Sequence, residues 1–175
     1  MANVDNPRGL KPLRTPGGGD IRIRKYAANV TTDVFQGDVV QMLASGRVKS
    51  ITTTTGTGAI IGVAANYIDA SDSGTTQDIW VYDDPDQEFE IQDDGDGATP
   101  SAAVVGATFS MILTTGNTTS GYSKQELDAS GAGTAATDPL LVLGFKVAPD
   151  AEVGKYAPHI VKLNRHILKV SSAGI

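Results

Sequence analysis

The sequence predicts an all-β protein in which an extended N-terminal arm, residues 1–20, precedes a single all-β domain, residues 21–175. The chain is rich in Gly, Thr, Ser, Ala and Val, a composition typical of short strands joined by small-residue loops. It is poor in the Leu, Glu and Lys that fill helices. Clusters of turn-forming residues recur about every 8–12 residues. We therefore expect strands to dominate, with helix below about 15%.

The arm is expected to be extended because Pro7, Pro12, Pro16 and the run Gly17–Gly19 interrupt it. Each proline lacks a backbone donor and fixes φ, so we expect no helix and no paired strand in this segment. The arm is either a disordered tail or a segment that orders on a neighbouring subunit. In the second interpretation, two leucines enter pockets and three basic side chains meet acidic ones: Leu10, Leu13, Arg8, Lys11 and Arg14.

Apolar or alternating runs separated by turns predict the strands in the first half of the body. They are residues 21–24, 39–43, 48–51 and 59–65. Gly62 interrupts the last run, which indicates a bulge or the close approach of another backbone segment.

Residues 78–97 are interpreted as the central hairpin of the fold. Residues 79–82 are β-branched or aromatic, and Asp83-Asp84-Pro85-Asp86 forms a turn. Beyond the turn, apolar and polar residues alternate through residues 88–92, as in a half-buried strand. We expect Trp80 and Phe89, or their strand neighbours Ile79, Val81 and Ile91, to be buried together.

The second half of the body is expected to contain strands at 109–113, 140–145 and 159–164. Residues 114–121 are interpreted as a polar loop, and residues 123–138 as the longest low-complexity loop. The final strand, which follows Pro158, is expected to close the domain. Leu163, Ile167 and Val170 would also fit one face of a helix.

Composition and charge exclude several classes of protein. The net charge of −6 argues against a general nucleic-acid binder, which needs clustered Lys and Arg. There is no cysteine, and no apolar run approaches the roughly 18 residues of a membrane span. The first residues have no apolar core and do not resemble a secretory signal. We expect a soluble protein that is made in a cytoplasm and does not bind a membrane.

The charges are unevenly distributed along the chain. Residues 1–25 carry six bases and two acids, whereas residues 69–96 carry eleven acids and no base. The chain is basic again from Lys146 onward. This distribution predicts an acidic body with two basic ends, which a partner surface could distinguish.

The sequence contains no recognisable catalytic or metal-binding pattern, so we predict no enzyme, no metal and no cofactor. His159 and His166 would point to opposite faces of an unbroken strand, and each is expected to be a surface or hydrogen-bonded residue. Asp94, Asp96 and Gly97 match three positions of a calcium loop. The match fails at its two ends, which are Gln92 and Ala103.

Five segments carry a resemblance to a known family. They are Met1-Ala2-Asn3-x-Asp5-Asn6-Pro7-Arg8-Gly9-Leu10-Lys11-Pro12, Phe35-x-Gly37-Asp38-x-Val40, Ile61-Gly62-Val63, Val81-x-x-Asp84-Pro85-Asp86-x-x-Phe89-x-Ile91-Gln92 and Val161-x-Leu163-Asn164-x-His166. In this order they resemble small capsid decoration proteins of tailed double-stranded DNA bacteriophages, also called cement or head-stabilisation proteins. The resemblance spans nearly the whole chain, and its motifs are turns and strand patterns.

The resemblance implies a β-sandwich or barrel-like body of the jelly-roll or β-tulip type on the outer surface of the capsid in the virion. It implies the major capsid protein as partner, and a homodimer or homotrimer. The arm would then make the capsid or inter-subunit contacts, through Pro7, Arg8, Leu10, Lys11, Leu13 and Arg14. On this interpretation the arm adds little to the stability of the body.

Two other functions remain open. One is another β protein of the virion, such as a tail-tube or head-fibre component. The other is a carbohydrate-binding β-sandwich module, which needs exposed aromatic side chains on which sugars stack. Since Trp80 lies in a predicted core strand, the sequence favours the decoration protein.

Overall fold

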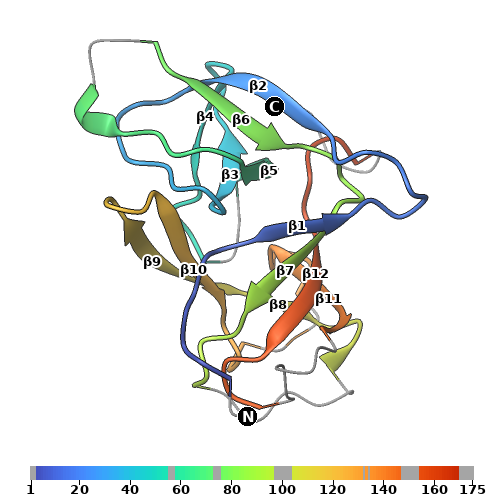
Figure 1. Ribbon diagram of the computed structural model, residues 1–175. Helices are drawn as coiled ribbons and strands as arrows, with labels where there is room; N and C mark the ends of the chain where they lie inside the picture. Colours follow the sequence, from blue (N-terminus) through green and yellow to red (C-terminus); the bar gives the residue numbers. More distant parts are fainter. Residues whose placement is uncertain are drawn as a thin grey trace.

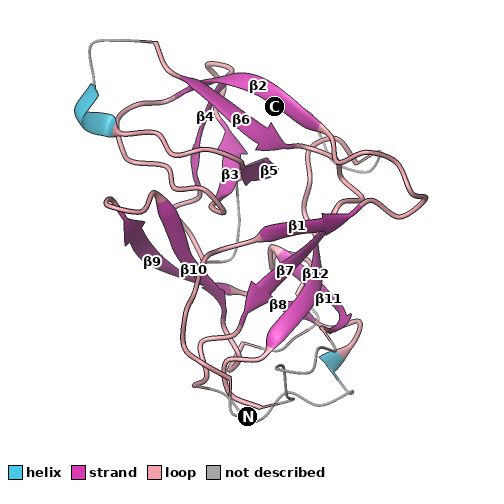
Figure 2. Ribbon diagram, in the orientation of Figure 1, coloured by secondary structure: helices cyan, strands magenta, loops and turns pink. Residues whose placement is uncertain are grey.

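The computed structural model describes residues 3–54, 58–72, 76–96, 104–131, 133, 135–146 and 154–169. Strands make up 46% of the structure and helix 3%, which confirms the all-β class and the low helix content (Figure 2). The helix includes one short 3-10 segment, Ala70–Asp72.

Five strands close into a barrel that forms the upper part of the molecule in Figure 1. They are β2 (Ile23–Ala28), β3 (Val39–Met42), β4 (Arg47–Ser50), β5 (Ala59–Ala64) and β6 (Asp78–Tyr82). Their order around the barrel is β2-β4-β3-β5-β6, and β2 pairs with β4 in parallel while the other pairs are antiparallel. Small and β-branched residues fill the barrel, among them Ala28, Val40, Val48, Ile61, Ile79 and Val81.

A five-stranded antiparallel sheet forms the lower part (Figure 1). It contains, in spatial order, β1 (Lys11–Arg14), β7 (Glu88–Gln92), β12 (Pro158–Leu163), β11 (Leu140–Phe145) and β8 (Thr108–Phe109). A separate hairpin, β9 (Met111–Asn117) and β10 (Tyr122–Leu127), lies beside it.

The second core joins the sheet and the hairpin to the outside of the barrel. Phe89, Val161 and Met111 come from the sheet and the hairpin, whereas Val39 and Ile60 come from barrel strands, and all five belong to one buried cluster. The barrel therefore has an apolar interior and an apolar outer face against which the rest of the chain packs.

The predicted central hairpin is wrong. β6 pairs with β2 and β5 in the barrel, whereas β7 pairs with β1 and β12 in the sheet. The turn at Asp84 is formed as expected, because the Asp84 carboxylate accepts the N–H of Asp86 at 2.9 Å. It connects two layers instead of two paired strands, since alternation predicts a half-buried strand but does not identify its neighbour.

Four residues of this region are buried as predicted, but the prediction that they are buried together is wrong, and so is the predicted burial of Trp80. Ile79 and Val81 are buried in the barrel, and Phe89 and Ile91 are buried in the second core, so the two pairs lie in different cores. The Trp80 side chain is 47% exposed. Trp80 takes the outward position of β6 because its two neighbours, Ile79 and Val81, point into the barrel.

β10 was predicted as loop, and β9 extends into a segment predicted as loop. Along β10 the inward positions are Ser123, Gln125 and Leu127, so the alternation is present but two of its three buried residues are polar. Gln125 is satisfied in the interior because its side-chain oxygen accepts the N–H of Val39 at 2.9 Å. A pattern defined by apolar residues cannot identify such a strand.

The bulge or close backbone approach that was expected at Gly62 is confirmed. A Cβ atom there would collide with the carbonyl oxygen of Tyr82, and the pairing of β3 with β5 changes register between Val40 and Gln41. The glycine therefore allows the close approach of β5 and β6 in the barrel.

Replacement of Phe89 by alanine should lower the free energy of unfolding by about 3–5 kcal/mol, because Phe89 is completely buried in the second core. The matched change Trp80→Ala removes a larger but half-exposed aromatic side chain, and it should cost less than about 1 kcal/mol. Urea titration measures both values. Equal losses for the two variants would contradict the assignment of Trp80 to the surface.

Candidate interaction site: the N-terminal arm

The arm is part of the five-stranded sheet. Lys11 lies opposite Glu90, Pro12 opposite Phe89, and Arg14 opposite Glu88, with a register shift between Pro12 and Arg14. The expectation that residues 1–20 contain no paired strand is therefore wrong. A proline removes one donor only, and β1 lies at the edge of the sheet, the position where a strand tolerates proline.

Leu10 anchors the arm to the body. Its side chain is 1% exposed and belongs to the second core, and its N–H donates to the carbonyl of Gly37 at 2.9 Å. Gly9 and Gly37 make this contact possible. Both have positive φ, and a Cβ on Gly9 would collide with the Gly37 carbonyl and come within 2.6 Å of Ser123.

Polar contacts continue along the arm on both sides of β1. Asn3 donates to the carbonyl of Lys155 at 3.0 Å, and the Asn6 N–H donates to the side chain of Gln92 at 3.2 Å. Thr15 donates to Gln87 at 3.1 Å. Contacts between the arm and the body therefore extend from Asn3 to Thr15, whereas residues 16–20 are exposed.

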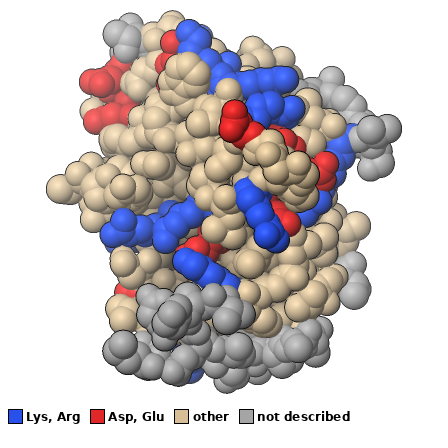
Figure 3. All heavy atoms as spheres, turned by 45° about the vertical axis from the view of Figure 1, so that its right-hand side comes forward, with Lys and Arg blue, Asp and Glu red and all other residues tan. Residues whose placement is uncertain are grey.

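The structure separates the basic side chains that the sequence grouped together. Arg14 Nε lies 2.7 Å from a Glu88 carboxylate oxygen, and Lys11 Nζ lies 3.6 Å from Glu90. Figure 3 shows Lys and Arg next to Asp and Glu at several places on one face. In both arm pairs the basic side chain is more than half exposed, whereas the carboxylate is largely buried. Two of the three basic side chains thus already have acidic partners within the chain.

The other predicted site residues have different surroundings. The Arg8 guanidinium lies over the ring of Tyr122, 5.0 Å from its centre. Leu13 is 37% exposed and Pro7 is half-buried. Of the two leucines, only Leu13 is available to a partner, because Leu10 is enclosed by the protein's own core.

A pocket of about 230 Å³ opens where the arm meets the barrel and the hairpin. We call it the arm pocket; its lining includes Arg8, Leu10, Lys11, Pro12, Tyr82 and Tyr122. Arg8, Leu10 and Lys11 are predicted contact residues, whereas Pro12 and the two tyrosines are not. Tyr82 ends a barrel strand and Tyr122 begins β10, so only the fold brings them together.

Carboxylates gather beside the start of the arm. Burial and the nearby carboxylates of Asp5, Asp94 and Asp93 raise the pKa of Glu126 to about 7. One oxygen of Glu126 is buried and has no hydrogen-bond partner in the described part of the chain. The protonated form is favoured because ionisation would add a fourth charge to this group.

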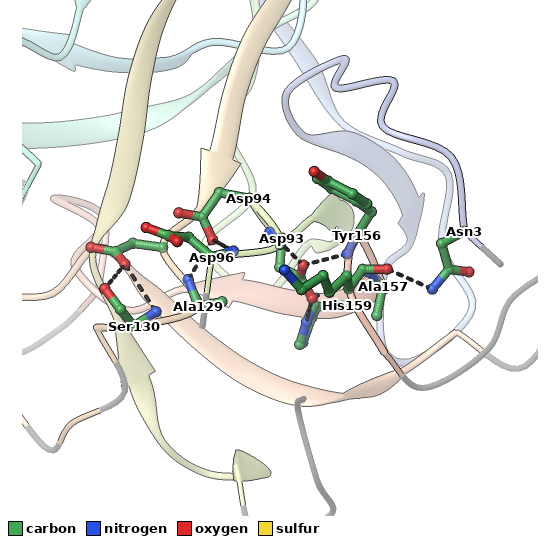
Figure 4. Close-up of polar contacts among 12 residues, drawn as sticks. Asn3, Asp93, Asp94, Asp96, Ala129, Ser130, Tyr156, Ala157 and His159 are labelled. Carbon is green, nitrogen blue, oxygen red and sulfur yellow. Dashed lines mark hydrogen bonds and ion pairs between the residues drawn. The ribbon is translucent and has the colours of Figure 1, made fainter. Parts of the chain in front are cut away.

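Asp93 and His159 form a buried polar network that fixes the exit of β7 against the start of β12 (Figure 4). Asp93 accepts the N–H groups of Gly95, Tyr156 and Ala157 at 3.0, 2.7 and 3.2 Å, and His159 Nε2 lies 3.0 Å from its carboxylate. Both side chains are completely buried, so a substrate cannot reach them without rearrangement. The network is a structural support.

Each histidine was expected to be a surface or a hydrogen-bonded residue, and both are hydrogen-bonded. His159 contacts Asp93, and His166, which is 2% exposed, accepts the N–H of Leu168 at 3.2 Å. The described residues contain no group of three side chains that could hold a metal ion. In the calcium-like segment, Asp94 accepts the N–H groups of Asp96 and Ala129, while Gly97 and Ala103 lie outside the described residues.

No helix within the described ranges is long and apolar enough to cross a membrane. Comparison of the chain with protein-family models, with curated proteins and with solved structures gives no match.

Leu10→Ala should reduce the free energy of unfolding by about 2–5 kcal/mol, because it removes a buried side chain from the second core. Leu13→Ala is the matched control and should change it by less than about 0.5 kcal/mol. Chemical denaturation of both variants measures the difference. A small effect of Leu10→Ala would mean that the arm is not anchored as described.

Deletion of residues 1–16 should lower the melting temperature by at least about 5 °C, since it removes Leu10 as well as β1. The burial of Leu10 thus reverses the expectation that the arm adds little to stability. Calorimetry of the truncated protein tests this. A melting temperature within a degree or two of the full chain would restore the original expectation.

The contribution of Glu126 to stability should fall as the pH rises from about 4.5 to about 7. Burial lowers the pKa of His166 from 6.5 to about 4, so His166 has the opposite effect over much of this range, and only the difference between the wild type and Glu126→Gln isolates Glu126. The folded-state pKa of about 7 exceeds the ordinary value of 4.5, so the folded protein holds a proton that the unfolded chain releases. Urea titrations at several pH values measure the trend in the wild type and in Glu126→Gln. Glu126→Gln should lack the pH-dependent stability that Glu126 contributes. Parallel pH profiles of the two proteins would contradict the raised pKa of Glu126.

Proposed function

We propose that this protein is a capsid decoration protein: a structural virion component, and not an enzyme, that binds the outer surface of an assembled phage capsid and stabilises it across subunit boundaries. The observation that carries the proposal is where the segments behind the resemblance lie in the fold. Arg8-Gly9-Leu10 contacts Gly37, and the Gly37 N–H donates to Ala64 at 2.9 Å, directly after Ile61-Gly62-Val63. On the other side, Pro12 pairs with Phe89.

Four of the five segments, which are far apart in the sequence, therefore meet around the arm. Because the four segments meet at one junction, we interpret them as a single structural unit and not as unrelated turns. A fifth segment, in β12, pairs with β7 and so borders the same unit. The residues behind the resemblance thus connect the arm, the barrel and the sheet.

A decoration protein acts by binding the assembled lattice better than free capsid subunits. Binding then stabilises the assembly by RT ln(1 + [L]/Kd) at each site. The partner in this proposal is the major capsid protein, and the decoration protein itself acts as a homodimer or homotrimer whose several copies reinforce attachment. It is made in the host cytoplasm and resides on the outer capsid surface of the virion.

One observation favours a second candidate, a carbohydrate-binding module. Trp80 is 47% exposed on the outside of the barrel, where it pairs across the strands with Lys25. An exposed indole is a suitable stacking platform for a sugar ring, and the sequence analysis had disfavoured this function because it placed Trp80 in the core. Tryptophan fluorescence during titration with oligosaccharides distinguishes this candidate from the first.

Co-sedimentation with expanded, empty capsids of the parent phage tests the proposed function. The protein should pellet with the capsids, saturate at a defined copy number and raise the temperature at which the capsids disassemble. Serum albumin mixed with the same capsids controls for trapping in the pellet. Failure to bind at protein concentrations of about 10 μM would contradict the proposal, as would binding without any gain in capsid stability.

A further inference from the structure

The arm pocket carries positive charge that the described residues do not neutralise. No carboxylate in the described ranges pairs with Arg8. Lys11 shares its acidic partner, because Glu90 lies 3.6 Å from Lys11 Nζ and 2.9 Å from Lys146 Nζ. Two cations thus compete for one carboxylate beside the pocket, and Arg8 has none in the part of the chain that the structure describes. The pocket therefore favours an anionic group from outside the chain.

Arg8 is held in place before any partner arrives. Gly9 follows it directly in the tight contact with Gly37, and a Cβ on Gly37 would come within 2.5 Å of the Arg8 carbonyl oxygen. The guanidinium lies over the Tyr122 ring at 5.0 Å. Stacking uses the face of a guanidinium and leaves its in-plane N–H donors available, the arrangement that binds a carboxylate with two parallel hydrogen bonds. The fixed backbone and the stacked guanidinium thus reduce the conformational entropy that is lost on binding.

The pocket has an apolar side as well as a charged one. Leu10 and Pro12 line it together with the Tyr82 ring, which packs edge-on against Phe89 in the second core. Burial raises the pKa of Tyr82, so its hydroxyl stays protonated. The volume of about 230 Å³ equals that of about eight liquid waters, which is enough for one side chain but not for an extended ligand.

We propose that the arm pocket receives one acidic side chain, Glu or Asp, from a partner protein, with its carboxylate on Arg8 and its methylene groups against Pro12 and Tyr82. In assigning that side chain to a capsid subunit, the inference rests on the proposed function. A nucleic acid is disfavoured as the occupant, because the net charge of −6 repels a polyanion. A single carboxylate on an apolar stem matches both sides of the pocket.

Nuclear magnetic resonance of the ¹⁵N-labelled full-length protein tests the pocket itself. Titration with N-acetyl-glutamate N-methylamide should shift the Arg8 side-chain signal and the backbone amides of Leu10 and Gly37. The isosteric glutamine compound should not. Arg8→Gln should weaken glutamate binding at least tenfold, whereas Lys25→Gln, which removes the same charge from a distant ion pair with Asp78, should leave it unchanged.

Three results of this titration would overturn the inference. They are equal shifts with the glutamine compound, unchanged binding in Arg8→Gln, and equal displacement by inorganic phosphate at the same concentration. The last would indicate an anion site without preference for a carboxylate side chain. Because Arg8 is exposed, we expect Arg8→Gln to fold, and its melting curve verifies this.

Co-sedimentation of the same variants with capsids tests the identity of the partner. Arg8→Gln should bind capsids at least tenfold more weakly than Lys25→Gln. If the wild type binds glutamate but not capsids, the proposed function is wrong and the pocket serves another partner. Suppose that the wild type binds capsids, but the glutamate compound does not shift the Arg8 signal and Arg8→Gln does not weaken capsid binding. The pocket inference is then wrong and the proposed function stands. Self-association that Arg8→Gln abolishes would instead place a second copy in the pocket and contradict the capsid assignment.

Discussion

The contact between Gly9 and Gly37 is the constraint on which the rest of the arrangement depends. Two backbone segments approach so closely that neither position accepts a Cβ, and this approach places Leu10 in the second core. From there the chain continues along β7, where Lys11–Arg14 adds a strand to the sheet. The arm therefore crosses the boundary between barrel and sheet and holds the two together (Figure 1).

This arrangement changes how the arm could contribute to binding. A disordered arm would lose about 1–2 kcal/mol per residue of backbone entropy when it ordered on a partner. Residues 3–15 lose that entropy during folding, so a partner would meet a preformed surface. Lys11 and Arg14 already have acidic partners within the chain. The salt-sensitive part of any attachment should then depend mainly on Arg8, and the arm pocket concentrates the remaining charge at one place.

Sequence reasoning predicted most strands of the body and the interruption at Gly62, because β-branched runs and turn residues report directly on local structure. It failed where the decisive information is tertiary. The segments around Trp80 and Phe89 were assigned to one hairpin although they belong to two layers, since a half-buried pattern is compatible with either arrangement. β10 was missed because Ser123 and Gln125 are buried as hydrogen-bonded polar residues. For the candidate site, the sequence indicated a group of arm residues, but no local signal showed that Gly37 and Tyr122 lie beside them.

Native-state amide hydrogen exchange tests most directly whether the arm is an integral part of the body. The Leu10 amide, which donates to Gly37, should exchange only when the whole protein unfolds, with the same free energy as the amides of β7. The amides of Gly17–Gly19, which lie in the exposed segment after β1, should exchange rapidly. If Leu10 instead exchanges as fast as this glycine run while β7 stays protected, the arm is detached in solution and the account of its anchor is wrong.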